Sequence, residues 1–215
     1  MAKQFPRLEA HHHRYIAEQH VFFTASAAPT GHVNISPRST DMFRVLDDNA
    51  VVYLDRTGSG NETAAHLKID KRLTIMFCAV AGPPLIMRLY GCGRVIHRES
   101  REFAALVTER FNGNAPLGAR QMVLLDFNIV QTSCGYGVPL FEYQEERPQM
   151  DAWAKAKGVD GIEEYWRAKI KPVWTTSQLD FSKFRPRTHH DGFEGADWLR
   201  LRNCWDYRTL AGGAA

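Results

Sequence analysis

Short β-type runs of apolar residues dominate the first two thirds of the chain. Tight turns join most of them, and the helical patterns between them are brief. This series favours an antiparallel barrel over a doubly wound parallel sheet, because parallel strands need long helical crossovers. The runs that predict strands are 21–26, 32–36, 43–46, 51–54, 73–78, 85–96 and 122–130.

Two glycines and a few helical patterns refine this picture. Gly91 and Gly93 stand inside a strand-like run, which indicates a bend or bulge that lets the sheet curl. Apolar residues at helical spacing surround the three histidines at 11–13, so we interpret these histidines as part of an amphipathic helix and assign them no chemistry. Two more short helices are predicted at 63–69 and 102–111.

One loop carries the main candidate chemistry. The stretch 57–63 reads Thr-Gly-Ser-Gly-Asn-Glu-Thr, follows the predicted strand at 51–54 and opens onto a predicted helix. Glycines and hydroxyls beside a helix N-terminus present N–H and O–H donors to an anion such as a phosphate. The alternative is a plain tight loop in which Asn61 caps the short helix.

A predicted hairpin would complete such a site. If the chain reverses at Asp48-Asn49, antiparallel pairing places Arg38 opposite Ser59. The planar guanidinium of Arg38 matches the oxygens of a phosphate, and Ser36 and Ser39 would add hydroxyls. We therefore expect both strands of this hairpin to contribute to one phosphate site.

Composition narrows the class of protein. Of 215 residues, 44% are hydrophobic and 24% charged, which fits one globular domain with a sizeable core. The formal net charge is only +3 and Lys and Arg are scattered, so we expect no nucleic-acid partner. Without an apolar run of membrane-spanning length or a signal-peptide pattern, we expect a cytoplasmic protein with no membrane partner. The dispersed cysteines lack metal-ligand spacing, so no metal is expected.

The order and spacing of these segments resemble a known family. They are similar to the flavin-binding core of the pyridoxamine 5'-phosphate oxidase-like proteins, the FMN-binding split barrels, and the later segments resemble one uncharacterised branch of that family. The resemblance covers about residues 5–143. The segments that carry it are 33–38, 51–55, 58–59, 64–67, 71–77, 89–95 and 130–139.

The resemblance implies a mainly β (α+β) fold, a six-stranded antiparallel split β-barrel with peripheral helices, in a domain spanning 1–145. It also implies a homodimer with FMN at the subunit interface. The implied cofactor-binding residues lie on two strands, on the loop that follows the second of them and on the helix after that loop. They are Asn34, Ile35, Ser36, Pro37, Arg38, Ser39, Asp55, Thr57, Gly58, Ser59, Gly60, Asn61 and Thr63.

The loop departs from the family pattern in one respect. Pyridoxamine-phosphate oxidases carry an Arg-Lys pair directly after the Gly-Ser, where this chain has Gly60-Asn61. Arg38 and neutral donors must then neutralise the phosphate. The substrate-phosphate residues of those oxidases are not recognisable either, so vitamin B6 oxidation is not the expected reaction.

No catalytic residue is assigned, because a bound flavin carries the hydride chemistry while the protein supplies orientation and electrostatics. Cys134 and Tyr136, within Ser-Cys-Gly-Tyr-Gly, are candidates for a substrate pocket, since glycines allow close approach and a tyrosine ring stacks on flat ligands. An equally good interpretation is a turn that redirects the chain at Pro139.

The C-terminal third predicts a second segment over 146–215. Helices are expected at 150–156 and 162–170, separated by glycines. An aromatic-rich tail follows, which we expect to pack on the barrel or on the dimer mate.

Two functions remain open at this level. The first is an FMN-dependent oxidoreductase acting on a small organic substrate, with electrons from a reduced nicotinamide or passed to oxygen. The alternative is a protein that holds a flavin, a deazaflavin or haem as a sensor or carrier without turnover. Polar groups converging over the ring would favour the enzyme.

Overall fold

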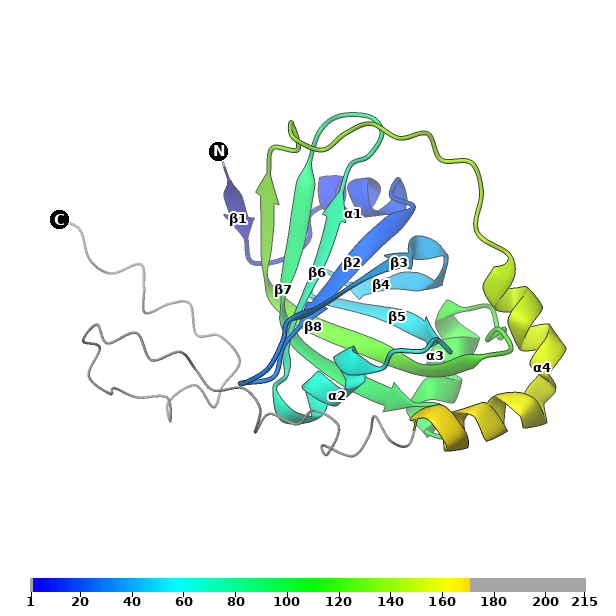
Figure 1. Ribbon diagram of the computed structural model, residues 1–215. Helices are drawn as coiled ribbons and strands as arrows, with labels where there is room; N and C mark the ends of the chain where they lie inside the picture. Colours follow the sequence, from blue (N-terminus) through cyan, green and yellow to red (C-terminus); the bar gives the residue numbers. More distant parts are fainter. Residues whose placement is uncertain (1, 171–215) are drawn as a thin grey trace, which may run out of the picture.

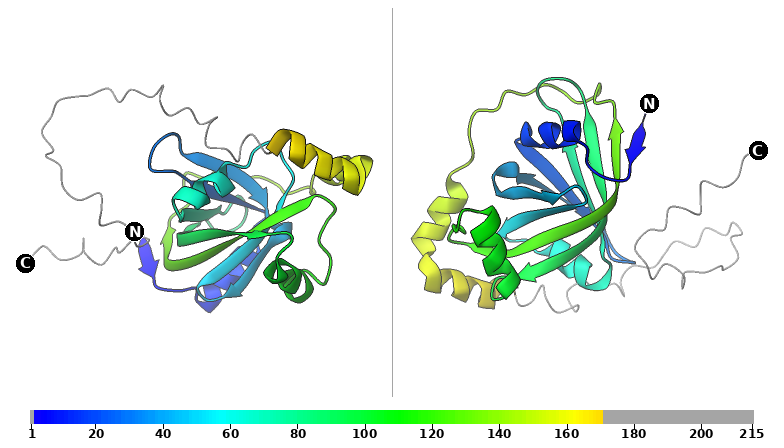
Figure 2. Two further views of the ribbon diagram at one scale, coloured as in Figure 1. Left: turned by 90° about the horizontal axis from the view of Figure 1, so that it is seen from below. Right: turned by 180° about the vertical axis from the view of Figure 1, so that it is seen from behind.

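The computed structural model describes residues 2–170 and consists of one strongly curled antiparallel sheet with helices at its edges and on its outer face (Figures 1 and 2). The mainly β, α+β split-barrel class is confirmed, but the sheet has eight strands rather than six. The strands are β1 (Lys3–Phe5), β2 (Val21–Ser26), β3 (Asn34–Ser39), β4 (Phe43–Asp47), β5 (Ala50–Arg56), β6 (Arg72–Cys78), β7 (Ile86–His97) and β8 (Ala119–Ser133).

Helices connect these strands or follow them. None of the helices in the described part of the chain is long and apolar enough to span a lipid bilayer. The predicted tail beyond residue 170 lies outside the described residues, and the domain division at 145 stays a prediction. The helices are α1 (Ala10–Ala17), the 3-10 turn η1 (Thr40–Met42), α2 (Glu62–Ile69), α3 (Arg101–Arg110), α4 (Gln149–Tyr165) and the π-helical turn η2 (Trp166–Ile170).

The break predicted between the C-terminal helices is present at Gly158. This residue has a φ of 67° and a ψ of 178°, which interrupts the helical path inside α4. A positive φ is easily adopted by glycine, which has no Cβ. The chain therefore turns within α4, and its second half continues directly into η2.

The pairing of the strands corrects the predicted hairpin. The order is β3-β2-β6-β7-β8-β5-β4, with β1 along β8. The turn at 48–49 joins β4 to β5, whereas β3 pairs with β2, so that Arg38 lies opposite Phe22 and not Ser59. The cause is η1, which separates β3 from β4. Ser39 caps its start, because the Ser39 side chain accepts a hydrogen bond from the Asp41 N–H at 3.2 Å.

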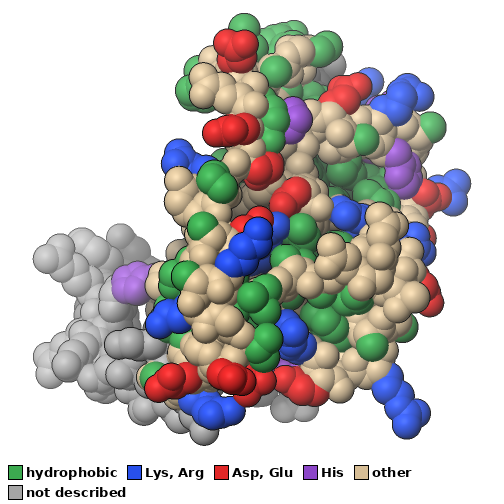
Figure 3. Space-filling model, turned by 90° about the vertical axis from the view of Figure 1, so that its right-hand side faces the viewer, with side chains coloured by type: hydrophobic (Ala, Val, Ile, Leu, Met, Phe, Trp, Pro, Cys, Tyr) green, Lys and Arg blue, Asp and Glu red, His purple; other side chains and the backbone are tan. Residues whose placement is uncertain are grey.

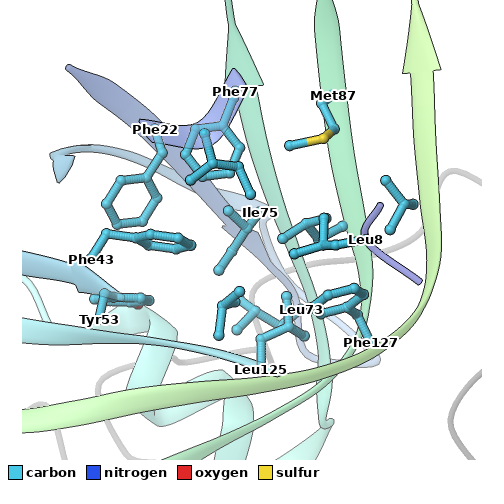
Figure 4. Packing of buried hydrophobic residues seen from close by; sticks show 14 of the residues in the cluster. Leu8, Phe22, Phe43, Tyr53, Leu73, Ile75, Phe77, Met87, Leu125 and Phe127 are labelled. Carbon is cyan, nitrogen blue, oxygen red and sulfur yellow. The ribbon is translucent and has the colours of Figure 1, made fainter. Parts of the chain in front are cut away.

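The apolar residues of the sheet form two clusters, one on each face. Inside the curl, aromatic and aliphatic side chains such as Phe22, Phe77 and Leu125 pack together (Figure 4). On the outer face, α3 covers a second cluster that includes Val52 and Phe103. Neighbouring residues of β5 and β8 point to opposite clusters, which explains why these strands read as continuous apolar runs rather than alternating ones.

The predicted bulge is confirmed at Gly91. The register of β7 against β8 shifts between Tyr90 and Gly91. A Cβ at Gly91 would overlap the Asp126 carbonyl oxygen and lie 2.5 Å from the Phe127 Cα, both of which belong to the backbone. The two longest strands therefore approach each other here more closely than any side chain permits.

We expect Gly91→Ala to destabilise the fold by about 1–3 kcal/mol, because a backbone must shift to admit the methyl group. Gly137→Ala is the matched control, since a Cβ at Gly137 meets no atom within 4 Å. Urea unfolding of both variants checks the expectation, and equal midpoints for the two would contradict it.

Candidate functional site

A cavity of about 1120 Å³ lies beside the open edge of the curled sheet. Its walls come from β2, β3, β5, β8 and the loop that leads into α2, and the segment 139–148, which we call the strap, borders it on the other side. The strap runs from the end of β8 across to α4 (Figure 1). The volume suits a cofactor or a small organic ligand.

A buried carboxylate organises the floor of the cavity. Asp55, at the end of β5, is only 2% exposed. Arg38 Nη1 donates to its Oδ1 at 2.5 Å, while Arg120 Nε and Gln121 Nε2 each donate to Oδ2 at 2.8 Å. Side chains of β3 and β8 thus converge on one residue of β5.

The same side chains also hold the loop. Arg120 Nη2 donates to the Gly60 carbonyl oxygen at 2.8 Å, and Gln121 Nε2 donates to Asn61 Oδ1 at 2.9 Å. Because Asn61 makes this contact, its side chain does not cap α2, although it stands at the N-cap position. The capping alternative for Asn61 is therefore wrong, and the loop is fixed from β8.

These contacts keep Asp55 ionised. Burial alone would raise the pKa of this carboxyl, but the charges of Arg38 and Arg120 and the hydrogen bonds from Arg120 and Gln121 outweigh it, so that its pKa lies below the ordinary value. Arg38 also stacks 4.7 Å from the centre of the Tyr53 ring, and burial raises the pKa of that phenol to about 12. Asp55 is thus an anion, and Tyr53 keeps its proton.

The loop presents backbone donors to the cavity. Within the described part of the chain, the N–H groups of Gly58, Ser59 and Gly60 have no hydrogen-bond partner, and all three residues line the cavity. A Cβ at Gly58 would meet no atom within 4 Å, so the space beside this backbone is open. Three successive free amides form a site suited to an anion.

The structure brings most of the predicted cofactor residues to this cavity. Those that line it come from β3, β5, the loop and α2. They are Ser36, Pro37, Arg38, Ser39, Asp55, Gly58, Ser59, Gly60, Asn61 and Thr63.

Three predicted cofactor residues do not line it. Asn34 instead ties β3 to α2, because its Nδ2 donates to Thr63 Oγ1 at 3.2 Å. Ile35 points outward and is 64% exposed. Thr57 is buried behind the loop, where its hydroxyl donates to the Gly118 carbonyl oxygen at 2.7 Å and accepts from Trp166 Nε1 at 2.8 Å.

The structure does not bring the candidate substrate residues to the cavity either. Cys134 is exposed, and Tyr136 is 83% exposed in the turn that follows β8. The Val138 N–H donates to the Gly135 carbonyl oxygen at 2.9 Å, which is the turn that the alternative interpretation expected. A role for Cys134 and Tyr136 in a substrate pocket stays a prediction.

Sequence reasoning missed two further parts of the site. Arg120 and Gln121 directly precede the apolar residues 122–125 of β8, and this polar pair at a strand end is the signal that could have pointed to them. The strap carried no signal, since it has neither strand nor helix period. Two contacts fix it: the Phe141 N–H donates to the Val80 carbonyl oxygen at 2.8 Å, and the Tyr143 ring stacks on His20 at 3.7 Å.

Charges of both signs are mixed on the side of the molecule that carries α4 (Figure 3). Arg56, which lines the cavity, illustrates this, because it pairs with Asp41 at 2.9 Å and with Asp151 at 3.3 Å. Positive charge on this face is therefore interspersed with carboxylates. The concentration of guanidinium groups around Asp55 is a local feature of the cavity floor.

Comparisons with known proteins match the part of the chain that builds the cavity. A family model described as pyridoxamine 5'-phosphate oxidase matches residues 8–134. The Aspergillus flavus pyridoxamine 5'-phosphate oxidase family protein ustO is 42% identical over 127 residues, which are 58% of this chain and 51% of ustO. The chain thus spans about half the length of this relative.

Solved structures show weaker similarity. An FMN-binding, pyridoxamine 5'-phosphate oxidase-related protein of Nostoc punctiforme is 14% identical, with a TM-score of 0.41 over 56% of this chain and 78% of that one. HutZ, the haem storage protein of Vibrio cholerae, is 16% identical, with a TM-score of 0.42 over 60% of this chain and 98% of that one.

The family model covers β2 to β8 together with the loop at 58–61, and so spans every strand that contributes to the floor of the cavity. It also accounts for well over half of the chain. This protein belongs to the pyridoxamine 5'-phosphate oxidase family.

Proposed function

We propose that this protein is an FMN-binding oxidoreductase that acts on a small organic substrate. Its family supports the proposal. The observation that carries it is the combination, in one cavity, of free loop amides and a cluster in which two guanidinium groups face one carboxylate. Such a combination suits the phosphate of FMN.

The residues present fit that phosphate. Arg38 and Arg120 together carry one more charge than Asp55 neutralises. An excess charge with little access to water is costly unless an opposite charge reaches it. The amides of 58–60 border the same cavity and would donate to the phosphate oxygens.

The other walls suit a flat ring. Phe22, Phe23 and Val123 line the cavity beside the polar floor, and Phe141 of the strap lines it as well. FMN supplies hydride transfer when bound, so the protein needs to bind it, orient it and limit the access of water. The strap contributes to that exclusion, because the stacking of Tyr143 on His20 holds it against the barrel.

A homodimer completes the proposal. β3 ends the strand order of the sheet. Ile35 within it is 64% exposed, and Val33 just before it is 66% exposed. An edge strand with exposed apolar side chains favours contact with another chain. A second copy would cover these residues and bring Ile35 into an interface beside the cofactor.

The substrate is proposed to differ from pyridoxamine 5'-phosphate. The loop has no Lys or Arg between Thr57 and Thr63, and the residues that bind the substrate phosphate in those oxidases are not recognisable in this sequence. A reduced nicotinamide or oxygen is the proposed electron partner. Holding a flavin without turnover is the competing outcome that the first experiment separates from this one.

The purified protein is expected to carry, or to take up, FMN and to show the two visible absorption bands of an oxidised flavin. Anaerobic addition of reduced nicotinamide is expected to bleach these bands, because the flavin accepts a hydride. Bands that persist with every electron donor tested would favour a flavin carrier. A colourless protein that takes up no added FMN would overturn both flavin functions.

Arg38→Ala is expected to weaken FMN binding about tenfold or more, because the remaining Arg120 and Asp55 charges then cancel. Arg94→Ala is the matched control, since it removes one positive charge from an exposed pair with Glu102, away from the cavity. Flavin fluorescence titrations compare the two. Equal affinities would show that the phosphate is held elsewhere.

Asp55→Asn is expected to lower the free energy of unfolding at neutral pH by about 3–5 kcal/mol, because two guanidinium groups lose their counter-ion. The folded pKa of Asp55 lies below its unfolded value of 3.8. Its stabilisation is therefore present above pH 3.8 and decreases as the pH falls below that value.

Urea unfolding at several pH values tests this expectation. The wild type should lose more stability than Asp55→Asn on acidification, whereas Asp160→Asn, at an exposed position of α4, should follow the wild type. Parallel pH profiles for all three proteins would contradict a stabilising role for the ionised Asp55.

A further inference from the structure

We propose that Arg120 is the second anion-binding cation of this site and donates directly to the phosphate of the bound flavin. This inference rests on the proposed function and deepens it. It assigns to β8 the positive charge that the loop between Thr57 and Thr63 does not contain. Arg120 would then be a binding residue as well as a partner of Asp55.

The hydrogen bonds of Arg120 leave one donor group unused. Its Nε donates to Asp55 Oδ2 and its Nη2 to the Gly60 carbonyl oxygen, each at 2.8 Å. Its Nη1 is buried and has no partner within the described part of the chain. The N–H groups of a guanidinium can only donate hydrogen bonds. Leaving the Nη1 donors buried without an acceptor is therefore energetically costly.

Arg120 borders the cavity beside the loop. The Arg120 side chain is only 7% exposed, yet the residue lines the cavity together with Gly58, Ser59 and Gly60. Its bond to the Gly60 carbonyl oxygen fixes the guanidinium beside the loop, whose residues 58–60 line the same cavity. A phosphate there would meet backbone donors and a guanidinium donor together.

The negative charges around the Arg120 guanidinium do not fully neutralise the positive charge of the cavity floor. Asp55 is the buried carboxylate of the cluster, and it is shared between Arg120 and Arg38. Glu62, whose carboxylate folds back over Gly60, and Glu142, Glu145 and Glu146 of the strap also border the cavity, but all four residues are exposed. Solvent screens these four carboxylates more strongly than the buried charges, so the floor keeps an excess of positive charge.

The test compares FMN with riboflavin, which has the same ring but no phosphate, on the full-length chain. Arg120→Met is expected to weaken FMN binding about tenfold or more and to change riboflavin binding by less than about threefold. Flavin fluorescence gives both dissociation constants. An unchanged ratio of FMN to riboflavin affinity in Arg120→Met would overturn the proposal.

A matched control separates binding from general loosening of the cluster. Gln121→Met removes a donor to the same Asp55 oxygen, but it removes no charge. We expect it to change the FMN and riboflavin affinities by the same factor. If both variants reduce the FMN preference equally, Arg120 acts only by positioning the loop, and the proposal fails.

Two further arms keep the outcome decisive. If Arg120→Met does not fold, Arg120→Lys replaces it, because a single ammonium can pair with Asp55 but cannot reach the carbonyl and a phosphate as well. If the wild type binds neither flavin, the proposed function fails. The anion site is then tested by the shift in melting temperature that inorganic phosphate causes, relative to chloride at equal ionic strength. Stabilisation of the wild type but not of Arg120→Met supports the site, and equal shifts overturn it.

Discussion

The carboxylate of Asp55 lies at the end of a buried strand, where a lone charge would be strongly destabilising. Arg38, Arg120 and Gln121 compensate that charge from two other strands, and the last two also hold the loop at Gly60 and Asn61. This cluster therefore joins β3 and the loop to β5 and β8, which are themselves paired along their backbones. The cavity is the space that these constrained elements border.

The sequence predicts local features of this protein well and long-range ones poorly. The apolar runs, the bulge at Gly91 and the break at Gly158 follow from the conformational preferences of nearby residues. The pairing of Arg38 with Ser59 does not follow from them, because the short turn η1 separates β3 from β4, and β3 pairs with β2 instead. The candidate site was identified through Arg38 and the loop, although the register used to join them was wrong.

The residues that the sequence left out share a physical reason. Arg120 and the strap reach the cavity through contacts that join distant parts of the chain, such as the bond from Arg120 to Gly60 and the stacking of Tyr143 on His20. The spacing of apolar residues along the chain contains no information about contacts between distant residues. The polar pair Arg120 and Gln121, directly before the apolar residues 122–125, is the sequence feature that accompanies this arrangement.

The end strand β3 contacts β5 through side chains and not through a ladder of backbone hydrogen bonds. Among the strands of residues 2–170, β3 pairs only with β2, and the Arg38 side chain connects it to β5. The barrel therefore has a seam closed by ion pairing, whose strength depends on the charges placed beside it. An anion that binds beside this seam helps to hold β3 against β5. Anion binding and the folding equilibrium are therefore thermodynamically linked.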